Sequence, residues 1–115
     1  MARPGHFRAF ERRSIQLTAS IRRKDNAPAI SARTVNIGLG GVCLELDAAT
    51  QSPRSEVVVE ITAPSLWDPL VLRGEIIWEQ PAPTRGKTRV GVRFAHESDA
   101  AIFSLFEVLN THGFE

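Results

Sequence analysis

The sequence has few of the residues on which several classes of protein depend. Its 115 residues include one cysteine, one methionine and no tyrosine, and the formal net charge at pH 7 is +1. A single cysteine cannot build a disulfide framework or a cysteine metal cluster within one chain, and it suits a reducing compartment, so we expect a cytoplasmic protein. A net charge this close to zero argues against general binding to nucleic acid, so we expect no DNA partner.

Long apolar runs are also missing. No stretch approaches the roughly 18 apolar residues of a membrane-spanning helix, and the first 13 residues lack the apolar core of a signal peptide, so we expect no membrane insertion. The histidines His6, His96 and His112 are scattered, and no carboxylate pair lies near a plausible nucleophile. The sequence therefore predicts no catalytic residues, no metal site, no cofactor and no enzymatic activity.

Alternation of apolar and polar residues is the main structural signal in the chain. It has the period of a half-buried β-strand and recurs in six segments, at residues 14–22, 29–35, 42–46, 57–61, 70–78 and 89–94. Turn-forming residues separate these segments, and helical periodicity is absent until the end of the chain. The pattern predicts an all-β fold, an antiparallel barrel or sandwich, of which a closed barrel leaves no exposed edge.

The alternation also predicts which side chains face the core. In the fifth segment it places Trp78 on the same side as Ile76, and in the sixth it turns Phe94 inward, so we expect both aromatic residues to be largely buried. Cys43 falls on the Glu45 side of the third segment, where it is expected to pack or to be partly exposed rather than to act as a nucleophile.

The last segment changes to a helical period. Apolar residues follow the i, i+3, i+4, i+7 rule, with two more that widen the stripe: Ile102, Leu105, Phe106 and Leu109, then Phe103 and Val108. Ser98 is the expected N-cap, and the helix is expected to end near Asn110. Such a helix covers a mouth or a wall of the barrel; a dimer surface is the alternative use.

A glycine-rich turn separates the second and third strand segments. It runs from Asn36 to Gly41 and holds three glycines in its last four positions. Glycine permits positive φ and the close approach of another group to the main chain. From these residues alone, the turn is either a hairpin or bulge, or a site that exposes backbone amides to a ligand.

The first 13 residues have no sustained period and are locally basic. We expect residues 1–13 to form a flexible arm in front of a single domain that spans residues 14–115. Arg8 and Arg12 lie four positions apart, and Arg13 follows directly. Guanidinium groups make paired hydrogen bonds to phosphate or to the O6/N7 edge of guanine, so the arm can grip an anionic ligand. A solvated basic tail is the alternative.

Together, these patterns resemble the PilZ domain, the bacterial receptor domain for cyclic di-GMP. The resemblance rests on the following features in order: the Arg8/Arg12 pair, a strand, Asn36-x-Gly38-x-x-Gly41, the strand with Ile76-Ile77-Trp78, Gly91-Val92-Arg93-Phe94, and a C-terminal helix. It covers nearly the whole chain. It implies a six-stranded antiparallel β-barrel with a C-terminal α-helix.

The resemblance also implies roles for particular residues. Arg8 and Arg12, assisted by Arg13, would bind guanine edges and phosphates, Asn36 would reach a guanine, and Gly41 would keep the turn open beside the ligand. Gly38 occupies the position of the motif serine. A glycine there loses one hydroxyl, which is expected to cost about 1 to 3 kcal/mol of binding free energy.

Two classes of function follow from the resemblance. In the first, the chain is a cyclic di-GMP receptor that orders its arginine arm on binding and signals to an unidentified effector protein. In the second, it is a degenerate PilZ domain that binds no nucleotide and acts as a protein interaction module, for a partner in motility, biofilm formation or polysaccharide export. A monomer or weak dimer is expected.

Overall fold

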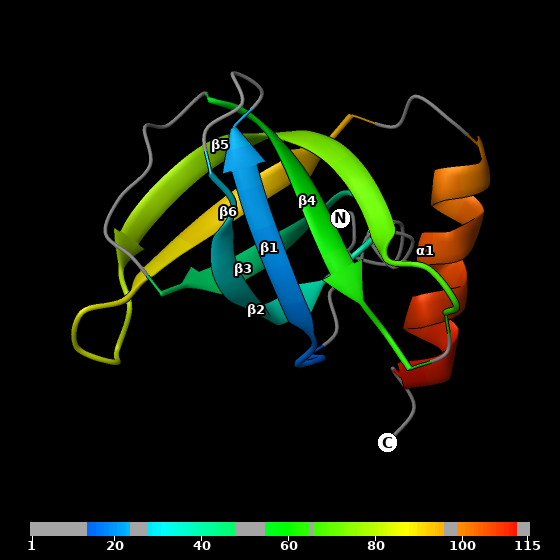
Figure 1. Cartoon of the computed structure of the whole chain (residues 1–115), viewed down its shortest axis with the longest axis horizontal. Helices are drawn as coiled ribbons and strands as arrows, with labels where there is room; N and C mark the ends of the chain where they lie inside the picture. The colour runs from blue at the N-terminus through cyan, green and yellow to red at the C-terminus, as the bar shows by residue number, and fades with distance from the viewer. Residues whose placement is uncertain (1–13, 24–27, 48–54, 65, 96–98, 113–115) are drawn as a thin grey trace, which may run out of the picture.

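The computed structural model describes residues 14–23, 28–47, 55–64, 66–95 and 99–112. The chain forms six strands and one helix (Figure 1): β1 (Thr18–Arg23), β2 (Ile30–Ile37), β3 (Gly41–Leu46), β4 (Glu56–Thr62), β5 (Leu70–Pro81), β6 (Thr88–Phe94) and α1 (Asp99–His112). The strands pair in the order β1-β2-β3-β6-β5-β4, all antiparallel, and β4 returns to β1. The predicted closed six-stranded barrel with a C-terminal helix is therefore confirmed.

The core lies inside the barrel and follows the predicted alternation over most of the chain. The side chains predicted to point inward from the first, third and sixth segments are buried: Ile15, Leu17, Ala19 and Ile21; Val42, Leu44 and Leu46; and Val90, Val92 and Phe94. Ile15 and Leu17 are buried although β1 begins only at Thr18. The strand pattern thus extends back toward the predicted arm, whose residues 1–13 lie outside the described part of the chain.

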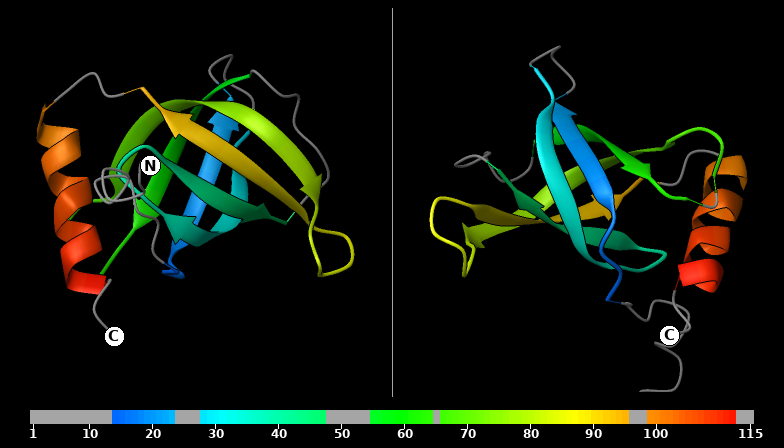
Figure 2. Two further views of the ribbon diagram at one scale, coloured as in Figure 1. Left: turned by 180° about the vertical axis from the view of Figure 1, so that it is seen from behind. Right: turned by 60° about the horizontal axis from the view of Figure 1, so that its bottom comes forward.

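The long strand β5 bends around the barrel and serves two neighbours. Its first half pairs with β4, its second half pairs with β6, and Gly74 belongs to both ladders. Figures 1 and 2 show the resulting curvature. The strand continues to Pro81, three residues beyond the predicted end at residue 78. Within this extension, Gln80 joins Ile77 and Trp78 on the outer surface beside β6.

Helix α1 packs beside β5 at one side of the barrel (Figure 2). Leu105, Val108 and Leu109 join the core, as predicted for a covering helix, and the helix continues past Asn110 to His112. Phe103 is 67% exposed, so its predicted place in the apolar stripe is wrong. Ser98 and the side chains of Ile102 and Phe106 lie outside what is described. In the part of the chain that the structure describes, no helix has the length and hydropathy needed to cross a membrane.

Candidate functional site

A β-bulge in β2 turns Asn36 to the outside of the barrel. The register with β3 shifts between Thr34 and Asn36, so that Thr34 pairs with Leu44 and Asn36 pairs with Cys43, with Val35 as the extra residue. Simple alternation from the buried Thr34 would have turned Asn36 inward. The extra residue instead keeps Ile37 in the core and leaves Asn36 at the outer surface, an effect typical of bulges near binding sites.

A second bulge, in β5, does the same for Trp78. The register with β6 shifts between Ile76 and Trp78, where Ile77 is the extra residue. Ile76 is fully buried, but Ile77 and Trp78 are both exposed, Trp78 at 37%. The prediction that Trp78 is largely buried is therefore wrong, because alternation cannot continue through a bulge.

The two bulges face each other across one row of paired residues. Asn36 pairs with Cys43, Cys43 with Gly91 and Gly91 with Trp78, so the row crosses β2, β3, β6 and β5. A surface hollow of about 400 Å³ lies over this row, and its lining comes from all four strands: Val35, Asn36, Cys43, Ile77, Trp78, Gln80, Arg89, Gly91 and Val92. Its volume falls within the range that small-molecule sites occupy, roughly 300 to 1,000 Å³.

Gly91 allows the indole of Trp78 to lie close to the backbone of β6 in the hollow. A Cβ atom at Gly91 would stand 2.2 Å from Nε1 and 2.3 Å from Cε2 of Trp78, closer than any real Cβ contact. Any side chain at position 91 would occupy the space of the indole ring, so this position of Trp78 requires glycine there. The half-exposed ring offers an aromatic face beside polar groups, which is suited to a flat ligand.

The glycine turn next to the hollow is tightly bonded within itself and to β6. The amide of Gly38 donates to the carbonyl of Gly41 at 2.9 Å, and the amide of Phe94 donates to the carbonyl of Gly40 at 2.9 Å. Among the described residues, the positive-φ glycine is Gly86, so the positive φ values expected in this turn are not found. The expected close approach is found, because a Cβ on Gly41 would stand 2.3 Å from the carbonyl oxygen of Val92.

Thr34 holds the chain segment that joins the predicted arm to the barrel. This side chain is 1% exposed; its hydroxyl donates to the carbonyl of Ile15 and accepts the amide of Leu17 at 2.7 Å. The amide of Thr34 also donates to the carbonyl of Leu17 at 2.9 Å. The chain therefore enters the barrel against β2, two residues before Asn36.

Thr34→Val is expected to lower the free energy of unfolding by about 2 kcal/mol, since it leaves the Leu17 amide and the Ile15 carbonyl buried without their partner. Denaturant unfolding followed by circular dichroism measures the change. Thr34→Ser keeps the hydroxyl and is the matched control, with an expected loss of about 1 kcal/mol or less. Equal losses for the two variants would contradict a hydrogen-bonded clamp.

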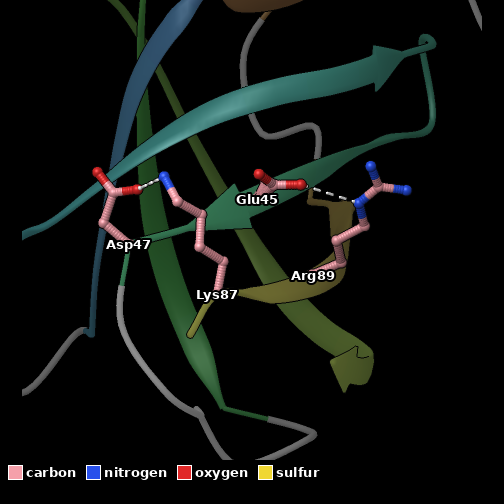
Figure 3. A network of polar contacts seen from close by, with 4 residues as sticks. All are labelled: Glu45, Asp47, Lys87 and Arg89. Carbon is pink, nitrogen blue, oxygen red and sulfur yellow. Dashed lines mark hydrogen bonds and ion pairs between the residues drawn. The ribbon is translucent and has the colours of Figure 1, made fainter. Parts of the chain in front are cut away.

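Two ion pairs lie near the hollow, one between β3 and β6 and one between the residues just beyond the ends of these strands (Figure 3). Arg89 Nε lies 3.2 Å from Glu45 Oε1, and Lys87 Nζ lies 2.6 Å from Asp47 Oδ1. The hydrogen bond and positive charge of Lys87 lower the pKa of Asp47, with a smaller contribution from Arg33. The side chain of Asp47 is exposed, so this pair is a surface feature with little effect on stability.

The structure brings together only part of the predicted site. Asn36 lines the hollow, whereas Gly38 and Gly41 lie in the adjoining turn, and Arg8, Arg12 and Arg13 lie outside the described residues. Sequence reasoning missed the contribution of Gln80 and Arg89 and the outward position of Trp78. The alternation in the sixth segment does predict that Arg89 and Gly91 face outward. Only the pairing of β6 with β3 and β5 locates these two residues at the hollow.

The chain is thus a small closed barrel with an outward tryptophan in a surface hollow beside a glycine turn. The family model of the PilZ domain matches residues 6–108, so the chain belongs to the PilZ family. The match begins before the described residues and includes the region of Arg8 and Arg12. The family resemblance inferred from the motifs is thereby confirmed.

Solved structures show the same fold at low sequence identity. The PilZ domain of CeSA from a cellulose-synthesizing bacterium aligns with a TM-score of 0.64 at 16% identity, covering 88% of this chain and 97% of that one. The PilZ domain of YcgR from Escherichia coli, solved with cyclic di-GMP, aligns with a TM-score of 0.70 at 16% identity, covering 91% and 90%. The Bacillus subtilis inhibitor of motility MotI/DgrA aligns with a TM-score of 0.69 at 15% identity, covering 93% of this chain and 49% of that one. A comparison with curated protein sequences found no significant match.

Proposed function

We propose that this chain is a cytoplasmic receptor for cyclic di-GMP that binds the nucleotide over the outer hollow and orders its arginine arm around it. The observation that carries the proposal is the pair of bulges that turn Asn36 and Trp78 outward on either side of one hollow. The family and the YcgR domain solved with cyclic di-GMP support the choice of ligand.

The lining of the hollow matches the chemistry of a guanine nucleotide. The amide of Asn36 can both donate and accept hydrogen bonds, and the indole of Trp78 offers a face on which a purine can stack. Three strand spacings, about 14 Å in all, separate β2 from β5, so Asn36 and Trp78 would contact different parts of the nucleotide. These groups supply orientation but no net positive charge, which the ligand's two phosphates require.

The arm is proposed to supply that charge. Thr34 fixes the chain at Ile15 and Leu17, and Arg12 precedes Ile15 by three residues. Three residues span at most about 10 Å and the seven from Arg8 to Ile15 about 25 Å, so both arginines are within reach of the barrel surface. Ordering the arm costs conformational entropy, which the charge-assisted contacts to phosphate offset. The ordered arm then changes the surface that an effector protein meets.

Calorimetric titration of the full chain with cyclic di-GMP tests the proposal, with linear GMP as the control nucleotide. We expect saturable binding in the micromolar range for cyclic di-GMP only. The receptor function is excluded if neither calorimetry nor a shift in melting temperature detects binding at high micromolar nucleotide and Gly38→Ser does not restore it.

Gly38→Ser is expected to tighten this binding by about 1 kcal/mol, or about fivefold, because it restores the hydroxyl of the family motif. The backbone at Gly38 does not require glycine through a positive φ. Its amide stays bonded to Gly41, so the added hydroxyl is the relevant change. Circular dichroism establishes that the variant is folded. Unchanged affinity in a folded variant would mean that the ligand does not contact this part of the turn.

A second candidate function is the protein interaction module. It is favoured by the exposed aromatic side chains of Trp67, in the loop between β4 and β5, and of Phe103 on α1. Exposed aromatic residues commonly anchor protein interfaces. The two functions are compatible, but only the receptor loses its activity when the arm or the hollow is altered.

A further inference from the structure

Beside the hollow, two arginines flank a single glutamate. Glu45 on β3 pairs across the strands with Arg33 on β2 and with Arg89 on β6, so two guanidinium groups flank one carboxylate. Arg89 in turn pairs with Gln80 on β5. Of the two arginines, Arg89 lines the hollow. This row lies directly next to the row of Asn36 and Trp78.

Arg89 is held by Glu45 through one nitrogen only. Nε donates to Glu45 Oε1 at 3.2 Å, with the side chains 30% and 14% exposed. Figure 3 shows the two terminal nitrogens of Arg89 on the far side of Nε from Glu45. Within the described part of the chain, these terminal nitrogens make no hydrogen bond. The bond from Nε to Glu45 thus holds the guanidinium in place, and its two terminal nitrogens form a pair of parallel donors.

Lys87, the residue just before β6, provides a comparison. It lies two residues before Arg89 and contacts a carboxylate in the same way, that of Asp47, the residue just after β3. Unlike Arg89, it does not line the hollow. Its ammonium is also a point charge without a fork of donors. Bulk electrostatics would make the two cations equivalent for a ligand, whereas directional recognition would not.

We propose that Arg89 determines base specificity, with its two terminal nitrogens donating to O6 and N7 of a guanine in the hollow, and that Glu45 is a positioning residue for it. This rests on the proposed function. A paired donor matches the two acceptors of guanine, whereas adenine offers N7 beside a donor amino group. Arg89 is also a diagonal neighbour of Trp78, through Gly91. A base stacked flat on the indole therefore presents its edge, not its face, toward the adjoining row.

Cyclic di-AMP separates base from phosphate recognition, because it has the same phosphates and different base edges. The full chain, Arg89→Lys and Lys87→Met are titrated with both nucleotides, after circular dichroism and thermal unfolding have shown that each variant is folded. Arg89→Lys keeps the charge and removes the fork. It is expected to weaken cyclic di-GMP binding about tenfold and to shrink the preference over cyclic di-AMP by a similar factor. Lys87→Met is expected to change both affinities less than threefold and to leave the preference intact.

The positioning role of Glu45 is tested by the same preference for cyclic di-GMP over cyclic di-AMP. Glu45→Gln keeps an oxygen that can accept the Arg89 Nε and is expected to retain the preference, whereas Glu45→Val is expected to reduce it severalfold. A purely structural role would change melting temperature without separating these two variants in their nucleotide preference.

Each other outcome overturns the assignment. Equal weakening of both nucleotides by Arg89→Lys means that Arg89 contacts phosphate and not guanine. Weaker binding of both nucleotides by Lys87→Met, with no loss in Arg89→Lys, means that only net charge matters. Unchanged binding by Arg89→Lys, or no preference in the unmodified chain, excludes the assignment while the receptor function stands. Binding of neither nucleotide by any form, including the unmodified chain, removes the proposed function together with it.

Discussion

Gly41→Ala is expected to lower the free energy of unfolding by about 3 kcal/mol or more, the largest stability effect of any single methyl group considered. The new Cβ would stand 2.3 Å from the carbonyl oxygen of Val92 and 3.3 Å from its carbonyl carbon. Both atoms belong to the backbone of β6, which cannot move aside without disturbing its pairing with β3. Denaturant unfolding of the full chain measures the loss.

Gly86→Ala is the matched control for this effect. Gly86 has φ of 82°, and nothing lies within 4 Å of a Cβ built there. The substitution therefore strains the backbone without a collision, and a loss of about 1 kcal/mol is expected. If Gly41→Ala were as mild as Gly86→Ala, the turn and β6 would have to be farther apart than they are here.

Arg12→Ala and Arg8→Ala are each expected to weaken cyclic di-GMP binding by about 2 kcal/mol, or about 30-fold, if the proposed function holds. Each substitution removes charge-assisted bonds to phosphate or guanine, and in the proposed arrangement no neighbouring group replaces them. Calorimetry of the full chain measures the loss. Because the arm precedes the described barrel, the melting temperature of the unliganded chain is expected to stay nearly unchanged.

Arg85→Ala controls for net charge. Arg85 is exposed in the loop between β5 and β6, and its removal lowers the total charge by the same one unit. We expect an affinity change of less than threefold for this variant, which is a screened long-range effect. A loss as large as that of Arg12→Ala would mean that overall charge, and not the arm, attracts the nucleotide.

Most of the fold was predictable because apolar and polar residues alternate along a half-buried strand. The inward residues of the first, third and sixth strands, such as Ile21, Leu44 and Val92, are buried as predicted. Strand ends were less predictable, since β5 continues to Pro81 in spite of the proline. A proline at the end of a strand removes only one donor from the ladder, and pairing with Thr88 outweighs that loss.

The candidate site was less predictable than the fold, and the reason is physical. A bulge is a property of two paired strands, so the residues Val35 and Ile77 carry no individual mark of being the extra ones. Alternation alone consequently predicts Trp78 in the core, although the residue belongs to the family signature. Asn36 was identified by its motif, whereas its outward direction and its partnership with Trp78 depend on contacts between distant segments. The hydrogen bonds from Thr34 to Ile15 and Leu17 likewise join distant segments and could not be predicted from either segment alone.

That clamp sets a length scale for the proposed arm. Thr34 holds Ile15 and Leu17, and Arg12 and Arg8 precede Ile15 by three and seven residues, so the tether in the proposed arrangement would be short. For a nucleotide already seated on the barrel, a short tether presents its groups at an effective concentration on the order of millimolar. Affinity in such an arrangement depends on the spacing between Arg12 and the clamp as much as on the contacts themselves. Two chains with the same arginines and the same hollow would bind differently if that spacing differed, since a longer tether dilutes the arm.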